Sequence, residues 1–256
     1  MAIKAVIFDA YNTLFRNETS YWTEIFGAIC QQQDLAVGPQ QLWDRWKSFE
    51  IQFRQTRTDM VNPDQSPPFK TYQVAWEEAF EQAFNSLGLS GNAYKASEQS
   101  VAGMAGRKPY EDTIPVLNFV NKHWKSSLLT NADNSFIMPL IERHGLMFSS
   151  VVTSEMAQAY KPSPKAFEKV LLETGVSATE SVYVGDTLLD DIHGAKLSGM
   201  IAVWINRDKK SLDDQLIAPD FEISELMDLI DILVDMSNTV GRSKLPAFSE
   251  RILGND

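Results

Sequence analysis

The chain has 256 residues, a formal net charge of -11, 44% hydrophobic residues and one cysteine. The negative charge argues against a nucleic-acid groove or an anionic membrane surface as partner, since both require positive fields, but a small anionic substrate can still be held by local cations. A single cysteine excludes an intrachain disulfide and agrees with a reducing compartment. The N-terminus shows no basic segment followed by an apolar run, so we expect a cytoplasmic protein.

A buried strand is predicted at the start of the chain. Val6, Ile7 and Phe8 form a short apolar run typical of strands that are buried on both faces. The run ends at Asp9, and residues 11–13 have the composition of a turn. Open α/β sheets place ligands at the carboxyl ends of their strands, so Asp9 is a candidate active-site carboxylate. From these residues alone, an ordinary turn after the strand is an equal alternative.

The region from residue 16 to residue 106 is predicted to contain helices and no strand. Apolar residues recur there at helical spacing in residues 20–33, 40–58, 71–87 and 93–104. The second of these helices has a basic face with Arg45, Lys47, Arg54 and Arg57. We interpret the tryptophans of this region as core residues, with a pocket wall as the alternative: Trp22, Trp46 and Trp76. The region is therefore expected to be an all-helical cap, inserted into a core formed by residues 1–15 and 107–256.

Strand and helix patterns alternate in the remainder of the chain. Strands are predicted at residues 126–129, 148–153, 181–184, 201–205 and 221–223, and helices at residues 109–120, 136–144, 164–174, 189–198 and 224–234. Such an alternation predicts an α/β fold with a parallel sheet and helices on both of its faces.

Chemically active side chains follow the predicted strands or begin the predicted helices: Asp9, Thr13, Thr130, Asn131, Lys161, Asp186, Asp190 and Asp191. The carboxyl ends of parallel strands share one edge, so these groups can converge. Asp9 is a candidate nucleophile, Thr130 and Asn131 offer a hydroxyl and an amide to an oxyanion, and Lys161 supplies positive charge. Clustered carboxylates such as Asp9 and Asp186 are stable around a cation, and oxygen ligands favour Mg²⁺.

The sequence resembles the haloacid dehalogenase superfamily over almost its whole length. Residues 8–15, Phe-Asp-Ala-Tyr-Asn-Thr-Leu-Phe, are similar to the first motif of that family, Thr130-Asn131 to the second, Lys161-Pro162 to the third, and residues 185–191 to the fourth. The motifs are short, but all four occur in order and on the expected elements. The resemblance implies a Rossmann-like core, a helical cap that closes over the substrate, and a covalent intermediate on an aspartate.

The resemblance also implies a role for each matching residue. Asp9 is the nucleophile and a Mg²⁺ ligand, and the Tyr11 backbone carbonyl and Asp186 are further ligands. Asp191 positions metal-bound water or the lysine, with Asp190 as the alternative residue. The other roles belong to groups around the transferring group: Thr13 orients the site, Thr130 and Asn131 hold that group, and Lys161 stabilises its charge.

Two features point to different activities within this family. Its phosphatases carry a second aspartate two residues after the nucleophile, where this chain has Tyr11, a poor base at neutral pH because its reference pKa is about 10. The dehalogenases have a tyrosine there, and Arg45 is similar to their halide-binding arginine if one inserted position is allowed, although a solvated basic helix face is the favoured interpretation of Arg45. The fourth motif, in contrast, keeps Asp186 as the Mg²⁺-dependent members do.

Three functional hypotheses follow. The first is a Mg²⁺-dependent phosphatase that acts on a small phosphorylated metabolite. The second is a metal-independent 2-haloacid dehalogenase, in which Asp9 displaces halide at carbon. The third is a binding or regulatory protein whose catalysis is weakened by Tyr11. All three have a small anionic ligand, and the sequence is compatible with a monomer or a homodimer.

Overall fold

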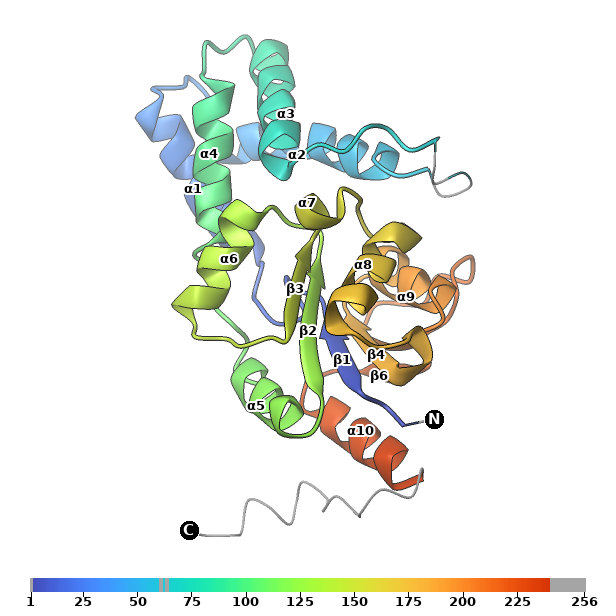
Figure 1. Cartoon of the computed structure of the whole chain (residues 1–256). Coiled ribbons are helices and arrows are strands. Elements are labelled where there is room, and N and C mark those ends of the chain that lie inside the picture. The colour runs from blue at the N-terminus through green and yellow to red at the C-terminus, as the bar shows by residue number, and fades with distance from the viewer. Residues whose placement is uncertain (1, 60–61, 63–64, 240–256) are drawn as a thin grey trace, which may run out of the picture.

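The computed structural model describes residues 2–59, 62 and 65–239. These residues contain a six-stranded sheet whose strand order is β3-β2-β1-β4-β5-β6, with every neighbouring pair parallel. The predicted α/β fold is therefore confirmed (Figure 1). The strands are β1 (Ala5–Phe8), β2 (Lys125–Thr130), β3 (Ser150–Thr153), β4 (Ser181–Gly185), β5 (Ile201–Ile205) and β6 (Phe221–Ile223).

The central strand β1 fixes the position of the first motif. All four of its residues are fully buried, as expected for a strand between two neighbours with helices on both faces. Its last residue, Phe8, pairs with Leu128 of β2 and Val184 of β4. Asp9 therefore leaves the sheet between the carboxyl ends of these two strands, which is the edge where an open α/β sheet binds ligands.

Two layers of helices cover the two faces of the sheet. Ile7 of β1 packs toward the face covered by α8 (Pro164–Thr174) and α9 (Gly194–Leu197), whereas Val6 and Phe8 belong to the core on the opposite face. This alternation is the two-residue period of a strand. The opposite face is covered by α5 (Thr113–His123), α6 (Asn134–Arg143) and α10 (Asp228–Thr239), as Figure 1 shows.

The remaining long helices form one layer beyond the sheet, which we call the helical segment. It consists of α1 (Thr19–Gln32), α2 (Pro39–Thr56), α3 (Tyr72–Leu87) and α4 (Ala93–Met104). Figure 1 shows this segment above the carboxyl ends of the strands, in contact with α6 below it. Within the described residues, 16–106 contain no strand, as the sequence predicts.

Three predicted helices differ from the sequence pattern in where they begin or in their helix type. The helix predicted over residues 224–234 begins at Asp228 and ends at Thr239. The helix predicted from residue 109 begins at Thr113, because Pro109 instead forms a bridge with Phe15 and the Thr113 hydroxyl donates to the Leu14 carbonyl. The helix predicted over residues 189–198 is a π-helical turn, Leu188–His193, followed by α9. The short helix α7 (Ser154–Ala157) had no sequence prediction.

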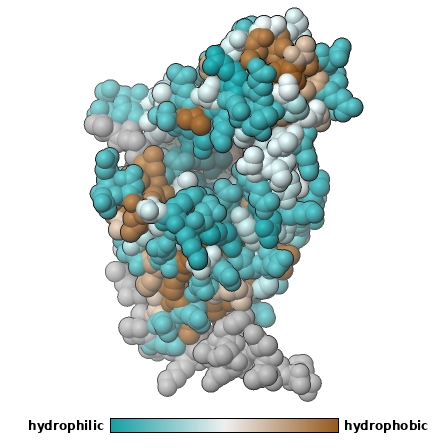
Figure 2. All heavy atoms as spheres, turned by 180° about the vertical axis from the view of Figure 1, so that it is seen from behind, coloured by the Kyte–Doolittle hydropathy of each residue, from teal (hydrophilic) through white to brown (hydrophobic). Residues whose placement is uncertain are grey.

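The exposed surface is mainly polar on the face shown in Figure 2, where apolar residues form separate patches rather than a continuous belt. Among the helices of the described residues, none has the length and apolar character that a membrane crossing requires.

Candidate active site

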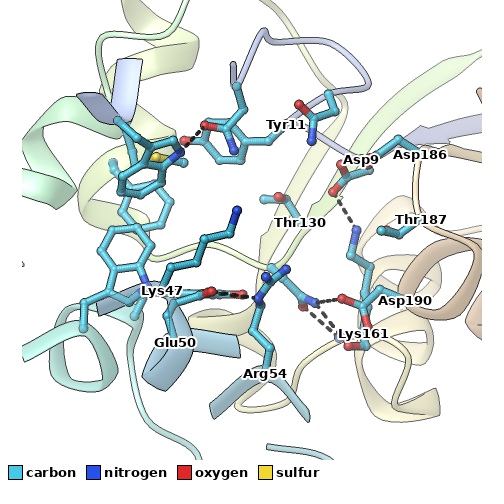
Figure 3. Close-up of a pocket in the computed structure, with 18 of the residues that line it drawn as sticks. Asp9, Tyr11, Lys47, Glu50, Arg54, Thr130, Lys161, Asp186, Thr187 and Asp190 are labelled. Carbon is cyan, nitrogen blue, oxygen red and sulfur yellow. Dashed lines mark hydrogen bonds and ion pairs between the residues drawn. The ribbon is translucent and has the colours of Figure 1, made fainter. Parts of the chain in front are cut away.

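The predicted lysine and two of the predicted aspartates meet at the carboxyl edge of the sheet. Lys161 Nζ lies 2.6 Å from Asp9 Oδ1 and 2.6 Å from Asp191 Oδ1. The three side chains are at least nine-tenths buried. Lys161 comes from the loop between α7 and α8, so segments distant in sequence build this cluster (Figure 3).

Asp191 is held in place by donors on every side. Its Oδ1 accepts hydrogen bonds from Lys161 Nζ and, at 2.8 Å, from the Tyr183 hydroxyl, while its Oδ2 accepts the Thr187 backbone N–H at 2.9 Å. A side chain at Gly185 would collide with it, since an added Cβ would lie 2.4 Å from Asp191 Cγ. Glycine at the end of β4 is therefore needed to bring this carboxylate under Lys161.

Burial and mutual attraction set the charges of this cluster. Burial raises the pKa of Asp9 to about 6, although the Lys161 ammonium opposes the change. Burial acts in the same direction on Asp191, but Lys161 and the Thr187 donors outweigh it and hold the pKa of Asp191 below its ordinary value. The two carboxylates in turn raise the pKa of Lys161 against the effect of burial. Lys161 therefore stays a cation, and the carboxylate of Asp9, the candidate nucleophile, is ionised above about pH 6.

Asp186 adds a further carboxylate beside Asp9. Carboxylate oxygens of Asp9, Asp186 and Asp191 lie within 4.8 Å of one another. Trp204 Nε1 donates to the Asp186 backbone carbonyl at 3.0 Å, whereas the Asp186 carboxylate has no hydrogen bond or ion pair within the described part of the chain. Burial and the two neighbouring carboxylates raise the pKa of Asp186 well above its ordinary value.

This donor set fits Mg²⁺. The oxygens of Asp191 are already occupied by Lys161, Tyr183 and Thr187, which leaves Asp9 and Asp186 to supply carboxylate ligands. The hydrogen bonds of the turn after β1 run between other groups, including Asn12 N–H to the Phe15 carbonyl, and do not use the Tyr11 carbonyl. Oxygen donors of this kind suit a hard divalent cation, which would relieve the repulsion that raises the pKa of Asp186.

Asn131 and Asp190 lie beside the cluster of Asp9, Asp191 and Lys161 and contact other groups. The Asn131 amide accepts the Lys161 backbone N–H at 2.8 Å and donates to the Lys161 carbonyl at 3.1 Å, so it fixes the backbone of the lysine. It also donates to Asp190 at 3.2 Å. Asp190 forms an ion pair of 2.7 Å with Arg57 of the helical segment. Of the two candidate acids, the structure therefore places Asp191 against Lys161 and Asp190 against the helical segment.

Tyr11 and Thr13 lie in the turn after β1, where Asn12 has a positive φ of 62°. The Tyr11 ring packs against Phe15 and Phe136, and its hydroxyl is buried without a hydrogen bond to the described residues. Burial raises the pKa of Tyr11, so the phenol stays neutral. The Thr13 side chain is fully buried, and its hydroxyl likewise lacks a partner among the described residues. Neither hydroxyl is placed as a general base.

A cavity of about 300 Å³ lies between Asp9 and the helical segment. Asp9, Thr130, Asn131, Lys161 and Asp186 line its floor. The side chains that the helices of this segment and the loops beside them contribute are mostly aromatic or charged: Trp22, Trp43, Trp46, Lys47, Glu50, Arg54, Arg57, Tyr72 and Trp76, together with Asn17, Thr19 and Met104. The tryptophan side chains are thus both core residues of this segment and part of the cavity wall.

Arg45 is not brought to this cavity. Its side chain is exposed, its Nε donates to Ser86 Oγ at 2.7 Å, and its guanidinium lies 4.9 Å from the centre of the Phe49 ring. The geometry therefore gives no support to its expected role in substrate binding. The basic residues that line the cavity from this part of the chain are Lys47 and Arg54 of α2 and Arg57, which directly follows α2. The sequence indicated them through the basic face that it predicts for this helix.

The structure also adds residues that the sequence pattern did not single out. Tyr183 donates to Asp191 and lies 2.9 Å from Lys161 Nζ, but in the sequence it looks like any residue of a buried strand. Glu50 lines the cavity and is buried against Arg54 at 2.9 Å. A glutamate within an amphipathic helix carries no signal of burial, because only the tertiary contacts decide which face it occupies.

A family model described as "haloacid dehalogenase-like hydrolase" matches residues 3–199, which include Asp9, Lys161, Asp186 and Asp191. The chain belongs to the haloacid dehalogenase-like hydrolase family. The predicted resemblance is thereby confirmed, and the chain is a hydrolase.

Among the relatives of this hydrolase, phosphatases and dehalogenases both occur. It is 35% identical over 139 residues to a glyceraldehyde 3-phosphate phosphatase of Methanopyrus kandleri, a match that covers 51% of this chain and 58% of the relative, less than two thirds of its length. It is 23% identical to haloacetate dehalogenase H-2 of Moraxella sp. (strain B), over 89% of this chain and 96% of the relative. The solved structure of a HAD phosphatase from Thermococcus onnurineus is similar with a TM-score of 0.64 and 25% identity, over 95% of this chain and 100% of the other.

Proposed function

We propose that this hydrolase is a Mg²⁺-dependent phosphatase that acts on a small phosphorylated metabolite, with Asp9 as nucleophile. The observation that carries the proposal is the carboxylate of Asp186, which lies beside Asp9 without an ion pair among the described residues. Such an arrangement is unfavourable without a cation and is suited to one. A dehalogenase, as the family resemblance implies, has no use for a metal and no need of this carboxylate.

The reaction proceeds in two steps. An Asp9 carboxylate oxygen attacks phosphorus, the ester P–O bond breaks, and the leaving oxygen departs with its electron pair and takes a proton from solvent. Water then attacks the phosphorus of the aspartyl phosphate, which releases inorganic phosphate and restores Asp9. When bound, Mg²⁺ would supply positive charge that lowers the repulsion between the anionic substrate and Asp9.

The neighbouring side chains have roles that follow from their positions. Lys161 stabilises negative charge on the transferring group, and Asp191 holds the ammonium in place. The Thr130 hydroxyl lines the cavity at the end of β2, where it can donate to a phosphoryl oxygen. Tyr11 stays neutral and does not act as a general base, so substrates with good leaving groups react fastest.

The helical segment is proposed to be a cap domain over the site. Residues 16–106 would form this domain, and residues 1–15 and 107–256 the catalytic core. The support is the cavity, which residues of both parts line. The phosphatase names of the relatives support the reaction type, and the short overlap with the first of them leaves the metabolite open.

A 2-haloacid dehalogenase is the second candidate. Tyr11 in place of an acidic residue favours it, and so does the relative from Moraxella, which matches over most of both chains. The position of Arg45 counts against it, because the residue expected to bind the halide is exposed outside the cavity.

One set of assays decides between these activities. We expect hydrolysis of 4-nitrophenyl phosphate that requires added Mg²⁺, is abolished by EDTA, and is lost in Asp9→Asn and Asp186→Ala variants. Turnover that EDTA and Asp186→Ala leave unchanged would contradict the proposal. Asp9-dependent chloride release from 2-chloropropionate, without metal, would establish the second candidate instead. A folded chain that is inactive in both assays would leave the binding or regulatory hypothesis.

A further inference from the structure

The cap side of the cavity has a wall of packed tryptophans. Trp22, Trp43, Trp46 and Trp76 come from three helices of the helical segment, and all line the cavity. The ring centres of Trp22 lie 5.0 Å from Trp43, 5.6 Å from Trp46 and 5.6 Å from Trp76. Because these rings already contact one another, their side chains lose little conformational entropy when a ligand binds. The wall is therefore preorganised to bind a flat apolar group.

Several polar groups of this wall have partners within the protein, whereas Trp76 Nε1 is buried without a hydrogen bond to the described residues. Trp22 Nε1 donates to Asn17 at 3.2 Å, and Trp46 Nε1 donates to the Trp76 carbonyl at 3.4 Å. Arg54 is paired with Glu50. The paired groups offer little to a substrate that carries many hydroxyls, because each new hydrogen bond would replace an existing one.

Arg57 is also neutralised. Its guanidinium is buried, forms the ion pair with Asp190 and donates to the Tyr72 hydroxyl. At this side of the cavity, Glu50 therefore neutralises Arg54 and Asp190 neutralises Arg57.

Lys47 is the exception among the basic residues that α2 contributes to the lining. Its side chain is exposed, and within the described part of the chain it has no ion pair. Its ammonium lies 5.2 Å from the centre of the Trp43 ring. Figure 3 shows the Lys47 side chain extending from α2 into the cavity, toward the side where Thr130 and Asp9 lie. The Glu50 carboxylate attracts Lys47 electrostatically, but it is ion-paired with Arg54 rather than with Lys47. A cation without an ion pair among the described residues, in front of an aromatic wall, is suited to an anionic group on a flat ligand.

We propose that Lys47 and the tryptophan wall select a phosphomonoester whose organic part is a flat apolar group that bears a second anionic group. The phosphoryl group lies at Asp9 and Lys161, the flat group contacts the wall, and the second anion pairs with Lys47. This substrate class rests on the proposed phosphatase function and narrows it. A polyhydroxylated sugar phosphate, in contrast, would find few unpaired partners at this wall beyond Trp76 Nε1 and the Lys47 ammonium.

Binding of stable phosphonates tests the proposal without turnover. The probes are benzylphosphonate, 4-carboxybenzylphosphonate and the aliphatic 3-phosphonopropionate, titrated by calorimetry into the full chain with Mg²⁺. We expect 4-carboxybenzylphosphonate to bind about tenfold more tightly than benzylphosphonate, the effect of one charge-assisted contact. Lys47→Gln removes this difference and leaves the affinity for benzylphosphonate unchanged. Lys95→Gln, at an exposed lysine of α4 outside the cavity lining, retains the difference.

Trp43→Leu tests the wall separately. It is expected to weaken binding of the two benzyl ligands about tenfold and to leave 3-phosphonopropionate within about twofold, because only the benzyl ligands carry a ring. The proposal is overturned if the carboxylate adds no affinity in the wild-type chain, or if Lys47→Gln weakens both benzyl ligands equally.

Assays of turnover separate this proposal from the phosphatase itself. If the protein hydrolyses phenyl, 4-carboxyphenyl and sugar phosphates with equal kcat/KM, it is a phosphatase, and the proposed selection among substrates is overturned. If the protein distinguishes the phosphonates through Lys47 but hydrolyses no phosphate ester, the proposed binding site is supported and the proposed phosphatase function is overturned.

Discussion

Lys161 Nζ and Asp191 Oδ1 lie 2.6 Å apart in a fully buried ion pair at the carboxyl edge of the sheet. A buried charge that loses its partner typically costs about 3 to 5 kcal/mol of stability. We therefore expect Asp191→Asn to lower the free energy of unfolding by about 3 kcal/mol at pH 7, measured by urea denaturation. The pKa of Asp191 is held below its ordinary value, so its ionised form stabilises the fold above its unfolded pKa of about 4, and this contribution fades as the pH falls below that value. A difference between the two proteins that grows on acidification would contradict this account.

The contribution of Asp9 to the free energy of unfolding changes with pH in the opposite direction. Burial raises its pKa to about 6, so its ionisation costs stability as the pH rises from about 4 through 6. In EDTA, Asp9→Asn is expected to match the wild type below pH 4 and to exceed its unfolding free energy by up to about 3 kcal/mol at pH 8. Added Mg²⁺ should reduce that advantage, because a cation favours the ionised carboxylate. Equal stability of the two proteins at pH 8 in EDTA would show that Asp9 ionises without cost.

Asp191 occupies space that a side chain at residue 185 would fill, so its position depends on glycine there. An added Cβ would lie 2.4 Å from Asp191 Cγ, within a cluster that has no room to move. Gly185→Ala is expected to destabilise the fold by about 2 kcal/mol and to remove most of the activity, since Asp191 must shift away from Lys161. Gly38→Ala is the control, because a Cβ there meets nothing within 4 Å. Thermal unfolding and turnover of 4-nitrophenyl phosphate report the two effects, and unchanged activity in Gly185→Ala would mean that the position of Asp191 is not critical.

Arg57 and Asp190 connect the helical segment to the core. Their ion pair of 2.7 Å joins residues that are far apart in sequence, and the Arg57 side chain is almost completely buried. A double-mutant cycle with Arg57→Leu and Asp190→Leu is expected to give a coupling energy of about 2 kcal/mol in unfolding experiments. Additive effects of the two substitutions would show that the pair does not hold the segments together.

The sequence could locate the core of the site because its residues lie next to strong local patterns. Asp9 ends an apolar run, and Asp186 follows another, so a parallel sheet had to bring them to one edge. Arg45 and Arg57 show the limit of such reasoning. Arg45 lies in α2 and Arg57 directly follows it, and whether each side chain faces solvent or the cavity depends on how that helix packs against the core. Tyr183 was missed for the same reason, since the partner of a buried tyrosine hydroxyl is set by tertiary structure.

If the protein is the proposed phosphatase, Tyr11 is expected to limit its use of substrates with poor leaving groups. Its hydroxyl is buried and has no hydrogen bond to the described residues, and its phenol stays neutral, so Tyr11→Phe is expected to keep turnover of 4-nitrophenyl phosphate within about twofold. Tyr11→Asp would place a carboxyl group two residues after the nucleophile and supply the missing proton transfer. We expect it to raise kcat/KM for an alkyl phosphate relative to 4-nitrophenyl phosphate by at least about tenfold, since general acid catalysis matters only when the leaving oxygen needs a proton. If Tyr11→Phe alone abolished turnover, the tyrosine hydroxyl itself would take part in the reaction. If Tyr11→Asp left the ratio unchanged while the protein stayed folded, proton transfer to the leaving group would not be what limits this enzyme.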